Sequence, residues 1–480
     1  MLLHRFEVEG LAHYSYAVGC PDAGVMAIVD PERNVDRYLE FADRHSMRIG
    51  HVLETHIHAD YASGARELAH RCGIEPAVSG YDKGETYEIA FKHRDLVDGD
   101  AIELGSVRIT ALFTPGHTPE HLSYLVHDRQ ASRDEPALLL SGDFLFVGSL
   151  GRPDLLGDQA KRGLAHALFR SVREKLAGLP DRLTVLPAHG AGSMCGSGMG
   201  GQASSTLGNE RLANPYLDPG LTETQFVEKI LGSVPPFPPY YRRMKTLNAK
   251  GPPLLGDSSG PEALVPETFQ GRLDSGHVAV DVRDPSAFCG GHLPDSFWMG
   301  AGPLLAVWAA WLVPDETPLL LVSEDQGQAA YAGRTLARVG LDGVVGYLQG
   351  GLDAWRQEDR PVRRASTTTV DELHDRLGAA APPTVLDVRT DREWDAGHID
   401  GAIHVFGGEL PGRLGELPPG PAPLAVVCGG GYRSLVAISV LERAGYEGLL
   451  NVTGGMGAWR AAHLPVACPA SAVGLAGGTP

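Results

Sequence analysis

The sequence predicts an α/β protein of several domains, and two observations lead to that prediction. Along residues 1–212, short apolar runs alternate with helical patterns, as in layered α/β domains. From residue 263 onward the chain repeats itself, because VDVRDPSAFCGGHLPDS (280–296) matches LDVRTDREWDAGHIDGA (386–402). Each repeat has the pattern of a small doubly wound domain, in which a strand ending in Asp-Val-Arg precedes alternating helices and strands.

Local patterns predict the elements of the first part of the chain. VMAIVD (25–30) and HVLETH (51–56) are apolar runs typical of buried strands. ASGARELAHRCG (62–73) has a helical pattern that ends at Gly73. ALLLSGDFLFVG (137–148) predicts another strand and the loop that leaves it.

Composition places the domain boundaries. Prolines and glycines gather in residues 213–262, which favours a connection between domains. The predicted domains on either side of it are 1–212, 263–363 and 366–467, and 468–480 predicts a loose tail. The chain of 480 residues agrees with about three domains of roughly 150 residues each.

Charge and hydropathy exclude some classes of protein. The net charge of −18 argues against nucleic acid and against an anionic membrane surface as partners. No apolar run is long enough to span a bilayer. Glu7 and Glu9 stand where a signal peptide would carry its apolar stretch, so we expect a cytoplasmic protein. The six cysteines lie far apart and are expected to be free thiols.

Six residues of metal-ligand type follow apolar runs in the first domain. They are His56, His58, Asp60, His117, Asp143 and His189. An isolated His-x-His pair is usually incidental in a loop. Six such residues in this order, each at a predicted strand exit beside glycine or proline, indicate a metal site.

These motifs resemble those of the metallo-β-lactamase superfamily, over residues 1–212. SGDFLFVGSLGRPDLLG (141–157) is similar to the branch that includes persulfide dioxygenases. The resemblance implies an αββα sandwich. Dinuclear hydrolases of the superfamily have a histidine where this chain has Tyr61, so a full second metal site is not expected.

The resemblance also implies one Fe(II) ion per chain, held by His56, His117 and Asp143. Two histidines and one carboxylate are the donor set of non-haem Fe(II) oxygenases. On the same basis His58, Asp60 and His189 are expected to orient ligands or waters. A hydrolase that works with one zinc ion stays open as the alternative.

Arg152 and Cys195 follow the candidate metal ligands Asp143 and His189 in the sequence, and each has two possible interpretations. Arg152 either forms a buried pair with Asp154 that holds the metal loop or binds the carboxylate of a persulfide substrate. Cys195, in HGAGSMCGSGMGG (189–201), is either an ordinary loop thiol or a sulfur-carrying residue beside the metal.

The second repeat contains a nucleophile motif, LAVVCGGGYRSLVAISVLERAGY (424–446). Cys428 follows four apolar residues and precedes a glycine loop, Arg433 and a helical run. A thiol in a cradle of backbone N–H groups at a helix N-terminus forms a thiolate readily, and Arg433 adds positive charge. The loop residues that form the cradle are Gly429, Gly430, Gly431, Tyr432 and Ser434.

Residues 366–467 resemble a rhodanese domain, with Cys-x4-Arg as the active-site loop. The resemblance implies that Cys428 carries sulfane sulfur between donor and acceptor. Asp387 and Arg389 are expected to form a structural ion pair. In the first repeat, counting back from GGLDAW places Glu324 at the cysteine position and Ala329 at the arginine position. That domain is therefore expected to be a degenerate rhodanese with a packing or docking role.

The order of the domains resembles the fused persulfide dioxygenase–sulfurtransferases of bacterial sulfide detoxification. The resemblance implies oxidation of a small thiol persulfide by O₂ to sulfite and thiol, with exchange of sulfane sulfur among persulfide, sulfite and thiosulfate. It also allows a homo-oligomer. Two alternatives stay open: a thioester hydrolase of the glyoxalase II kind with appended rhodanese domains, and a non-catalytic sulfur carrier or sensor.

Overall fold

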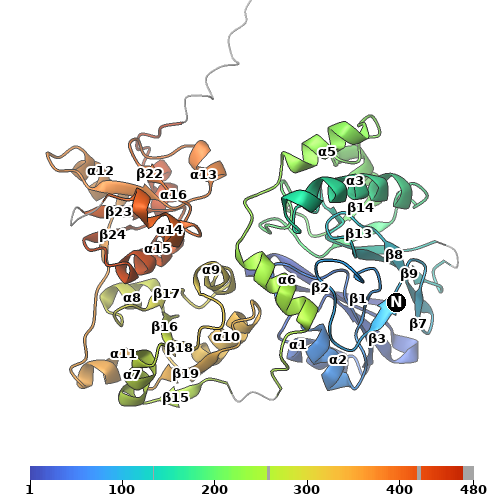
Figure 1. Cartoon of the computed structure of the whole chain (residues 1–480), viewed down its shortest axis with the longest axis horizontal. Coiled ribbons are helices and arrows are strands. Elements are labelled where there is room, and N and C mark those ends of the chain that lie inside the picture. Colours follow the sequence, from blue (N-terminus) through green and yellow to red (C-terminus); the bar gives the residue numbers. More distant parts are fainter. Residues whose placement is uncertain (133–134, 257–259, 419–422, 469–480) are drawn as a thin grey trace, which may run out of the picture. The chain divides into compact units, whose positions relative to one another are not determined.

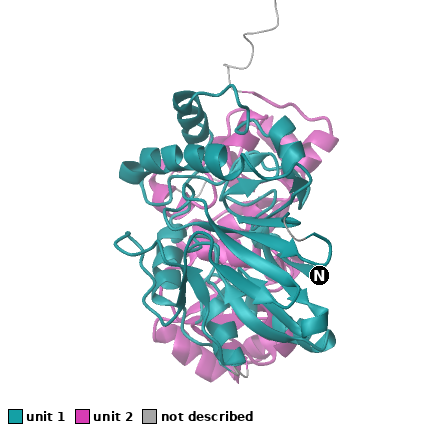
Figure 2. Cartoon of the chain, turned by 90° about the vertical axis from the view of Figure 1, so that its right-hand side faces the viewer, with its two compact units in different colours: residues 1–258, 334–342 teal, residues 259–333, 343–480 magenta. Residues whose placement is uncertain are grey.

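The computed structural model describes residues 1–132, 135–256, 260–418 and 423–468. The chain forms two compact units, which Figure 2 shows in different colours. Unit 1 comprises residues 1–258 and 334–342, and unit 2 comprises residues 259–333 and 343–480. The predicted tail falls largely on residues 469–480, which lie outside the described residues.

Unit 1 contains two six-stranded sheets (Figure 1). The first has the order β1 (Leu2–Val8), β2 (His13–Cys20), β3 (Val25–Val29), β4 (Arg48–Leu53), β5 (Ala77–Ser79), β6 (Arg94–Leu96). The second has the order β14 (Ser205–Thr206), β13 (Thr184–Pro187), β10 (Leu138–Gly142), β9 (Leu122–Asp128), β8 (Val107–Phe113), β7 (Ala101–Leu104). A small hairpin, β11 (Leu145–Phe146) with β12 (Ser149–Leu150), follows β10.

Alternating side chains of the strands bury both faces of each sheet. Val18 and Val25 of the first sheet share one core with Val107 and Leu140 of the second, because successive side chains of a strand point to opposite faces. The outer faces are covered by helices: α1 (Asp36–Arg44) and α2 (Ala65–Cys72) on the first sheet, and α3 (Asp158–Lys175) and α5 (Glu223–Leu231) on the second. This arrangement confirms the predicted αββα sandwich.

The proline-rich stretch 213–262 contains more structure than its composition suggests. After α4 (Leu207–Ala213), the chain forms α5 and α6 (Tyr240–Lys250), and both helices belong to unit 1. Thr222 begins α5 with a capping box to Gln225. Asn248 of α6 donates to the carbonyl oxygens of His58 and Tyr61. The helix α6 thus supports the loop that carries the candidate metal ligands.

Unit 2 contains two five-stranded parallel sheets with the same topology. The first has the order β15 (Glu262–Leu264), β19 (Val344–Leu348), β18 (Leu319–Val322), β16 (Val278–Asp281), β17 (Phe297–Trp298). The second has the order β20 (Ser366–Thr368), β24 (Leu449–Val452), β23 (Leu424–Val427), β21 (Thr384–Asp387), β22 (Ile403–His404). The shared strand order confirms the doubly wound repeat predicted from the sequence.

Helices connect the strands of both repeats. In the first repeat they are α7 (Pro266–Asp274), α8 (Pro285–Gly290), α9 (Leu305–Leu312), α10 (Gln326–Ala337) and α11 (Gly351–Gln357). In the second they are α12 (Val370–Leu377), α13 (Asp391–Asp395), α14 (Leu410–Arg413), α15 (Tyr432–Arg443) and α16 (Gly455–Ala461). Across the part of the chain that the structure describes, no helix is long and apolar enough to cross a membrane.

The Asp-Val-Arg motif forms a buried ion pair in both repeats. Arg389 donates through Nε and Nη2 to the Asp387 carboxylate, and Arg283 does the same to Asp281. In each repeat the arginine also donates to a glycine carbonyl eight residues farther along the chain. The predicted structural pair is confirmed, and its presence in both repeats identifies it as a feature of the fold.

The strand register corrects one alignment made from the sequence. Asp387 pairs with Val427 and Asp281 pairs with Val322, so the residue that matches Cys428 is Ser323 rather than Glu324. The count from GGLDAW failed because the first repeat has one residue more than the second between this position and the Gly-Gly motif. The connection after α10 (338–343) and the strand β19 are each one residue longer than their counterparts after α15, which outweighs a loop before α10 (323–325) that is one residue shorter than 428–431. The second residue of α10 is Gly327, where α15 has Arg433.

Candidate metal centre and sulfur-transfer loop

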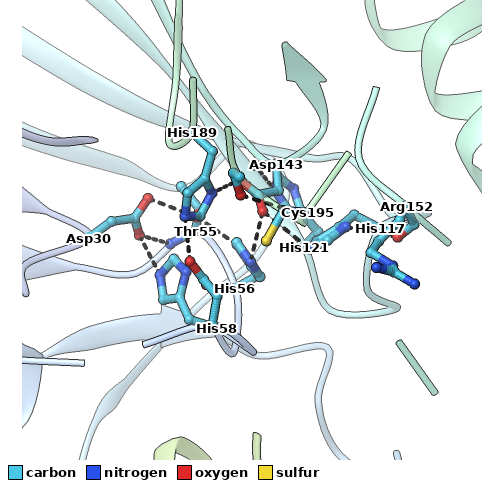
Figure 3. Close-up of polar contacts among 12 residues, drawn as sticks. Asp30, Thr55, His56, His58, His117, His121, Asp143, Arg152, His189 and Cys195 are labelled. Atoms are coloured by element: carbon cyan, nitrogen blue, oxygen red, sulfur yellow. Dashed lines mark hydrogen bonds and ion pairs between the residues drawn. The ribbon is translucent and has the colours of Figure 1, made fainter. Parts of the chain in front are cut away.

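The fold brings His56, His117 and Asp143 together in unit 1. Each follows a strand: β4, β8 and β10 respectively. Their ligand-type atoms lie within 4.8 Å of one another. Asp143 Oδ2 is 3.8 Å from His56 Nε2 and 3.4 Å from His117 Nε2, and all three side chains are buried (Figure 3).

Hydrogen bonds fix the imidazole rings of His56 and His117 in the tautomer with the proton on Nδ1, which leaves the lone pair of Nε2 free. The carbonyl oxygen of Arg152 can only accept, so His117 donates to it through Nδ1–H at 2.8 Å. The Thr55 hydroxyl donates to Asp30 and therefore accepts from His56 Nδ1–H at 2.9 Å. Burial lowers the pKa of both rings well below the usual value, which keeps them neutral, as metal binding requires.

Three atoms of this group lack hydrogen-bond partners among the described residues. They are His56 Nε2, His117 Nε2 and Asp143 Oδ2. A buried polar atom without a partner costs about 1–3 kcal/mol, and the three converge on one point. A metal ion bound by two imidazole nitrogens and one carboxylate oxygen would satisfy all three. The residues present therefore fit a mononuclear metal.

His189 lies between two carboxylates and links them. Its Nδ1 is 2.7 Å from Asp143 Oδ1, and its Nε2 is 2.7 Å from Asp60 Oδ2. Asp143 and Asp60 raise the pKa of His189 to about 10 against the opposing effect of burial. Asp60, His189 and Cys195 also bring ligand-type atoms within 4.8 Å of one another. His189 thereby fixes the orientation of the Asp143 carboxylate.

His58 belongs to a different group of buried side chains, with Asp30 and Glu54. Its Nε2 lies 3.2 Å from Asp30 Oδ1 and 2.8 Å from Glu54 Oε2. These carboxylates raise the pKa of His58 well above its usual value, although burial acts in the opposite direction. Asp30 and Glu54 were not identified from the sequence. Each follows directly after an apolar strand, which is the same signal that marked the other candidates.

Tyr61 supplies no ligand to the group. Its hydroxyl donates to the carbonyl oxygen of Asp30 at 3.3 Å, and burial raises the pKa of the phenol well above 10. Its ring packs against His13, with centroids 4.0 Å apart. His13 is fully buried, and neither ring nitrogen has a hydrogen-bond partner among the residues described. Sequence reasoning missed His13, which stands in no motif.

His121 is another buried histidine of the site that was not identified from the sequence. Its Nε2 accepts from the Asp143 N–H at 3.1 Å, and its Nδ1 contacts Thr114 Oγ1 at 2.9 Å. Burial lowers the pKa of His121 to about 3, so the ring is neutral. It therefore positions the backbone of a candidate ligand. The sequence TPEH placed it four residues after His117, at the start of β9.

The contacts of Arg152 are those of a buried structural pair. The guanidinium donates to Asp154 through Nε and Nη2, at 2.6 and 2.7 Å. Its remaining N–H groups reach the carbonyl oxygens of Met194, Pro235 and Pro236. All five donors are therefore engaged within unit 1. Of the two interpretations of Arg152 left open by the sequence, these contacts favour the buried pair with Asp154, because they engage every N–H group of the guanidinium.

Cys195 lies close to the candidate centre but is not activated by its surroundings. It is 1% exposed, and its Sγ lies 3.7 Å from Tyr241 Oη. Burial, followed by Asp60 and Asp143, raises the pKa of the thiol well above its usual value. The thiol is therefore protonated near neutral pH. The structure brings it to the centre but gives it no thiolate character.

A cavity borders the candidate centre. Its polar side includes Glu54, His56 and His58. Its apolar lining is formed by Ile57, Val78, Ile89, Phe91 and Pro252, and Asn248 and Arg66 also line it. This lining suits a small, largely apolar group presented to the metal ligands.

Cys428 lies at the end of β23, in a loop of close backbone contacts. Gly431 N–H donates to Cys428 Sγ at 3.0 Å, and Ser434 Oγ lies 3.5 Å from the sulfur. A Cβ on Gly455 would meet the Cys428 carbonyl oxygen at 2.2 Å, so glycine is required there. Gly431 has a φ of 106° and begins α15. The Gly431 N–H thus faces the sulfur at the N-terminus of α15, where it could donate to a negatively charged sulfur.

Arg433, near Cys428, forms an ion pair with Glu393. Its Nη1 and Nη2 donate to the two carboxylate oxygens of Glu393, each at 2.6 Å. Glu393 also accepts from the N–H and hydroxyl of Thr390 in a capping box. These partners outweigh burial and lower the pKa of Glu393 to about 2. This pair is not visible in the sequence, since the two residues lie 40 positions apart.

Comparisons with known proteins agree with this architecture. The profile of the metallo-beta-lactamase superfamily matches residues 9–189, and that of the rhodanese-like domain matches residues 265–358 and 369–462. A metallo-beta-lactamase structure from Staphylococcus aureus is 31% identical and covers 72% of this chain and 98% of its own, with a TM-score of 0.64.

Two of the many curated proteins that match this chain differ in the activity that their names give. A probable metallo-hydrolase of Burkholderia pseudomallei is 34% identical over 197 residues, which cover 38% of this chain and 64% of the relative. The chain therefore spans less than two thirds of that protein. The mitochondrial persulfide dioxygenase ETHE1 of Bos taurus is 27% identical over 222 residues, which cover 45% of this chain and 76% of the relative.

Proposed function

Because the chain belongs to the metallo-β-lactamase superfamily and continues into two rhodanese-like domains, we propose that it oxidises a small thiol persulfide and transfers sulfane sulfur. In this proposal residues 1–212 carry the oxidation and residues 366–467 carry the transfer. Residues 263–363 form a degenerate domain that packs within unit 2. The relationship to ETHE1 and the rhodanese-like domains support a role in sulfur metabolism.

The observation that carries the oxidation is the convergence of His56 Nε2, His117 Nε2 and Asp143 Oδ2 without other partners. Two neutral imidazoles and one carboxylate suit Fe(II) and leave coordination positions open. When bound there, one Fe(II) ion would supply adjacent sites for O₂ and for a persulfide sulfur. Tyr61 supports a single ion, because its hydroxyl is committed to the Asp30 backbone.

The overall oxidation is R–S–SH + O₂ + H₂O → R–SH + H₂SO₃. The chain's own residues hold the reacting groups in place. His189 and His121 fix Asp143 through its carboxylate and its N–H. The apolar side chains of Ile89 and Phe91 line the cavity beside the metal ligands, where they would contact the persulfide.

Sulfur transfer uses Cys428 as the nucleophile. Its thiolate attacks the sulfane sulfur of thiosulfate or of a persulfide, the original S–S bond breaks, and sulfite or a thiolate leaves. A thiolate or sulfite acceptor then attacks the outer sulfur of the Cys428 persulfide, and the Cys428 thiolate is released. Gly431 N–H stabilises the anionic sulfur in both steps.

A thioester hydrolase is the second candidate, favoured by the likeness to the probable metallo-hydrolase of Burkholderia pseudomallei. Metal analysis and O₂ uptake separate the two. The proposal predicts iron and O₂ consumption with glutathione persulfide. Zinc together with rapid hydrolysis of S-lactoylglutathione would favour the hydrolase. A sulfur carrier without turnover would show neither activity.

A further inference from the structure

The two repeats of unit 2 provide an internal comparison between a loop with a thiol and a loop without one. Both keep the buried Asp–Arg pair. Both also stack an aromatic ring on a histidine: Trp394 on His398 and Phe288 on His292. Features found in both repeats serve the fold. Features found only beside Cys428 are candidates for the transfer reaction.

Glu393 is one of the features found only beside Cys428. It is the third residue of α13, and the third residue of α8 is Ala287. The repeat that has Ser323 in place of Cys428 therefore also lacks this carboxylate and has Gly327 in place of the arginine. The fold accepts alanine at this position, so folding alone does not require Glu393.

The Glu393–Arg433 pair lies against the residue that follows the nucleophile. A Cβ on Gly429 would be 2.8 Å from Arg433 Nη2 and 3.7 Å from Glu393 Oε1. The side chains of Arg433 and Glu393 are 22% and 36% exposed, whereas Cys428 is 1% exposed. The Glu393–Arg433 pair thus forms a partly exposed, charged border beside the buried Cys428 thiol. A sulfur donor or acceptor that approaches Cys428 would contact this pair.

The pair carries no net charge. An unpaired arginine at this border would attract anions, because partly buried charges are only weakly screened. The bidentate carboxylate cancels that charge and occupies one edge of the guanidinium fork.

We propose that Glu393 is a specificity-determining residue of the sulfur-transfer site, which cancels the charge of Arg433 and so lowers the preference for anionic acceptors that an unpaired arginine would confer. The inference rests on the proposed sulfur-transfer function. In the step concerned, an acceptor thiolate attacks the outer sulfur of the Cys428 persulfide, that S–S bond breaks, and the Cys428 thiolate leaves. The charge elsewhere on the acceptor decides how readily it approaches the border.

The test uses the full-length holoenzyme, loaded with thiosulfate and handled without O₂. Three thiols of similar size discharge it: cysteamine (cationic), 2-mercaptoethanol (neutral) and thioglycolate (anionic). Loss of one sulfur from the Cys428 peptide is followed by mass spectrometry. In Glu393→Gln the ratio of the thioglycolate to the cysteamine rate constant should rise about fivefold, as expected for removing one partly exposed charge.

Controls separate charge from structure. Glu393→Asp keeps the charge and should keep the wild-type ratio. Glu416→Gln removes an equivalent carboxylate from the Arg413 pair of the same domain and should change nothing. If Glu393→Gln does not fold, Glu393→Ala replaces it, since alanine stands at this position in the first repeat.

Two results would overturn the inference. One is an unchanged ratio in the variant that lacks the charge. The other is an equal fall of all three rate constants, which would mean that Glu393 only holds the loop in shape. Failure of thiosulfate to load wild-type Cys428 would instead refute the proposed sulfur transfer itself, so the two failures are distinct.

Discussion

His189 Nδ1 lies 2.7 Å from Asp143 Oδ1, which leaves Asp143 Oδ2 directed at the Nε2 atoms of His56 and His117. One carboxylate thus serves both a histidine and the candidate metal position. The first prediction follows from this contact. His189→Ala should weaken iron binding about 10- to 100-fold, because the Asp143 carboxylate loses the partner that orients it.

Competition with a chromogenic chelator measures that affinity. His166→Ala provides a control, since His166 is a partly exposed histidine paired with Glu223. An affinity equal to that of the wild type in His189→Ala would show that Asp143 needs no such support.

Arg152 provides a prediction about stability. Arg152→Ala should lower the free energy of unfolding by about 3 kcal/mol, because a buried guanidinium with five engaged donors is removed and Asp154 loses its partner. Denaturant unfolding measures the change, with Arg413→Ala as a surface control worth under about 1 kcal/mol. A stable Arg152→Ala variant that loses only its preference for carboxylate-bearing persulfides would restore the substrate-binding interpretation.

Cys428→Ser should leave O₂ uptake near the wild-type rate and reduce thiosulfate formation to background. Serine is not ionised near neutral pH, so no persulfide forms in the loop. The candidate iron ligands come from unit 1, whereas Cys428 belongs to unit 2. Sulfite and thiosulfate are measured separately while O₂ is recorded. Unchanged thiosulfate would show that Cys428 does not link the two activities.

The degenerate repeat should stay inactive even with a thiol. Adding Ser323→Cys to the Cys428→Ser chain should not restore thiosulfate:cyanide sulfurtransferase activity, because that loop is one residue shorter and has Gly327 where α15 has Arg433. Cys428→Ser alone gives the baseline. Activity above it would mean that the thiol suffices and that the glycine loop and arginine are dispensable.

The parts of the fold that a single local sequence pattern determines were predicted correctly. The repeated Asp-Val-Arg motif placed two doubly wound domains, because both copies bury the same ion pair. Gly73 ended a helix as predicted, since its φ of 67° suits glycine at a helix C-terminus. The helices α5 and α6 were not predicted. Their flanking prolines dominated the composition, and the contacts that hold α6 are to residues about 190 positions earlier.

The candidate site was only partly predictable, for a similar reason. Metal-ligand residues at strand exits are visible in the sequence, and three of them meet in the fold. The partners that commit His58 and Arg433 elsewhere, Glu54 and Glu393, depend on side-chain orientation across loops. Counting along the chain also misplaced the thiol position of the first repeat, because that repeat has one residue more than the second between this position and the Gly-Gly motif.

The central claim is a mononuclear iron centre that oxidises persulfides. Its most direct test is metal analysis of protein purified without added metal, combined with O₂ uptake on glutathione persulfide by the same sample. We predict one iron per chain and O₂ consumption that is lost in His117→Ala. Two tightly bound zinc ions per chain, with S-lactoylglutathione hydrolysed and persulfide left unchanged, would contradict the account.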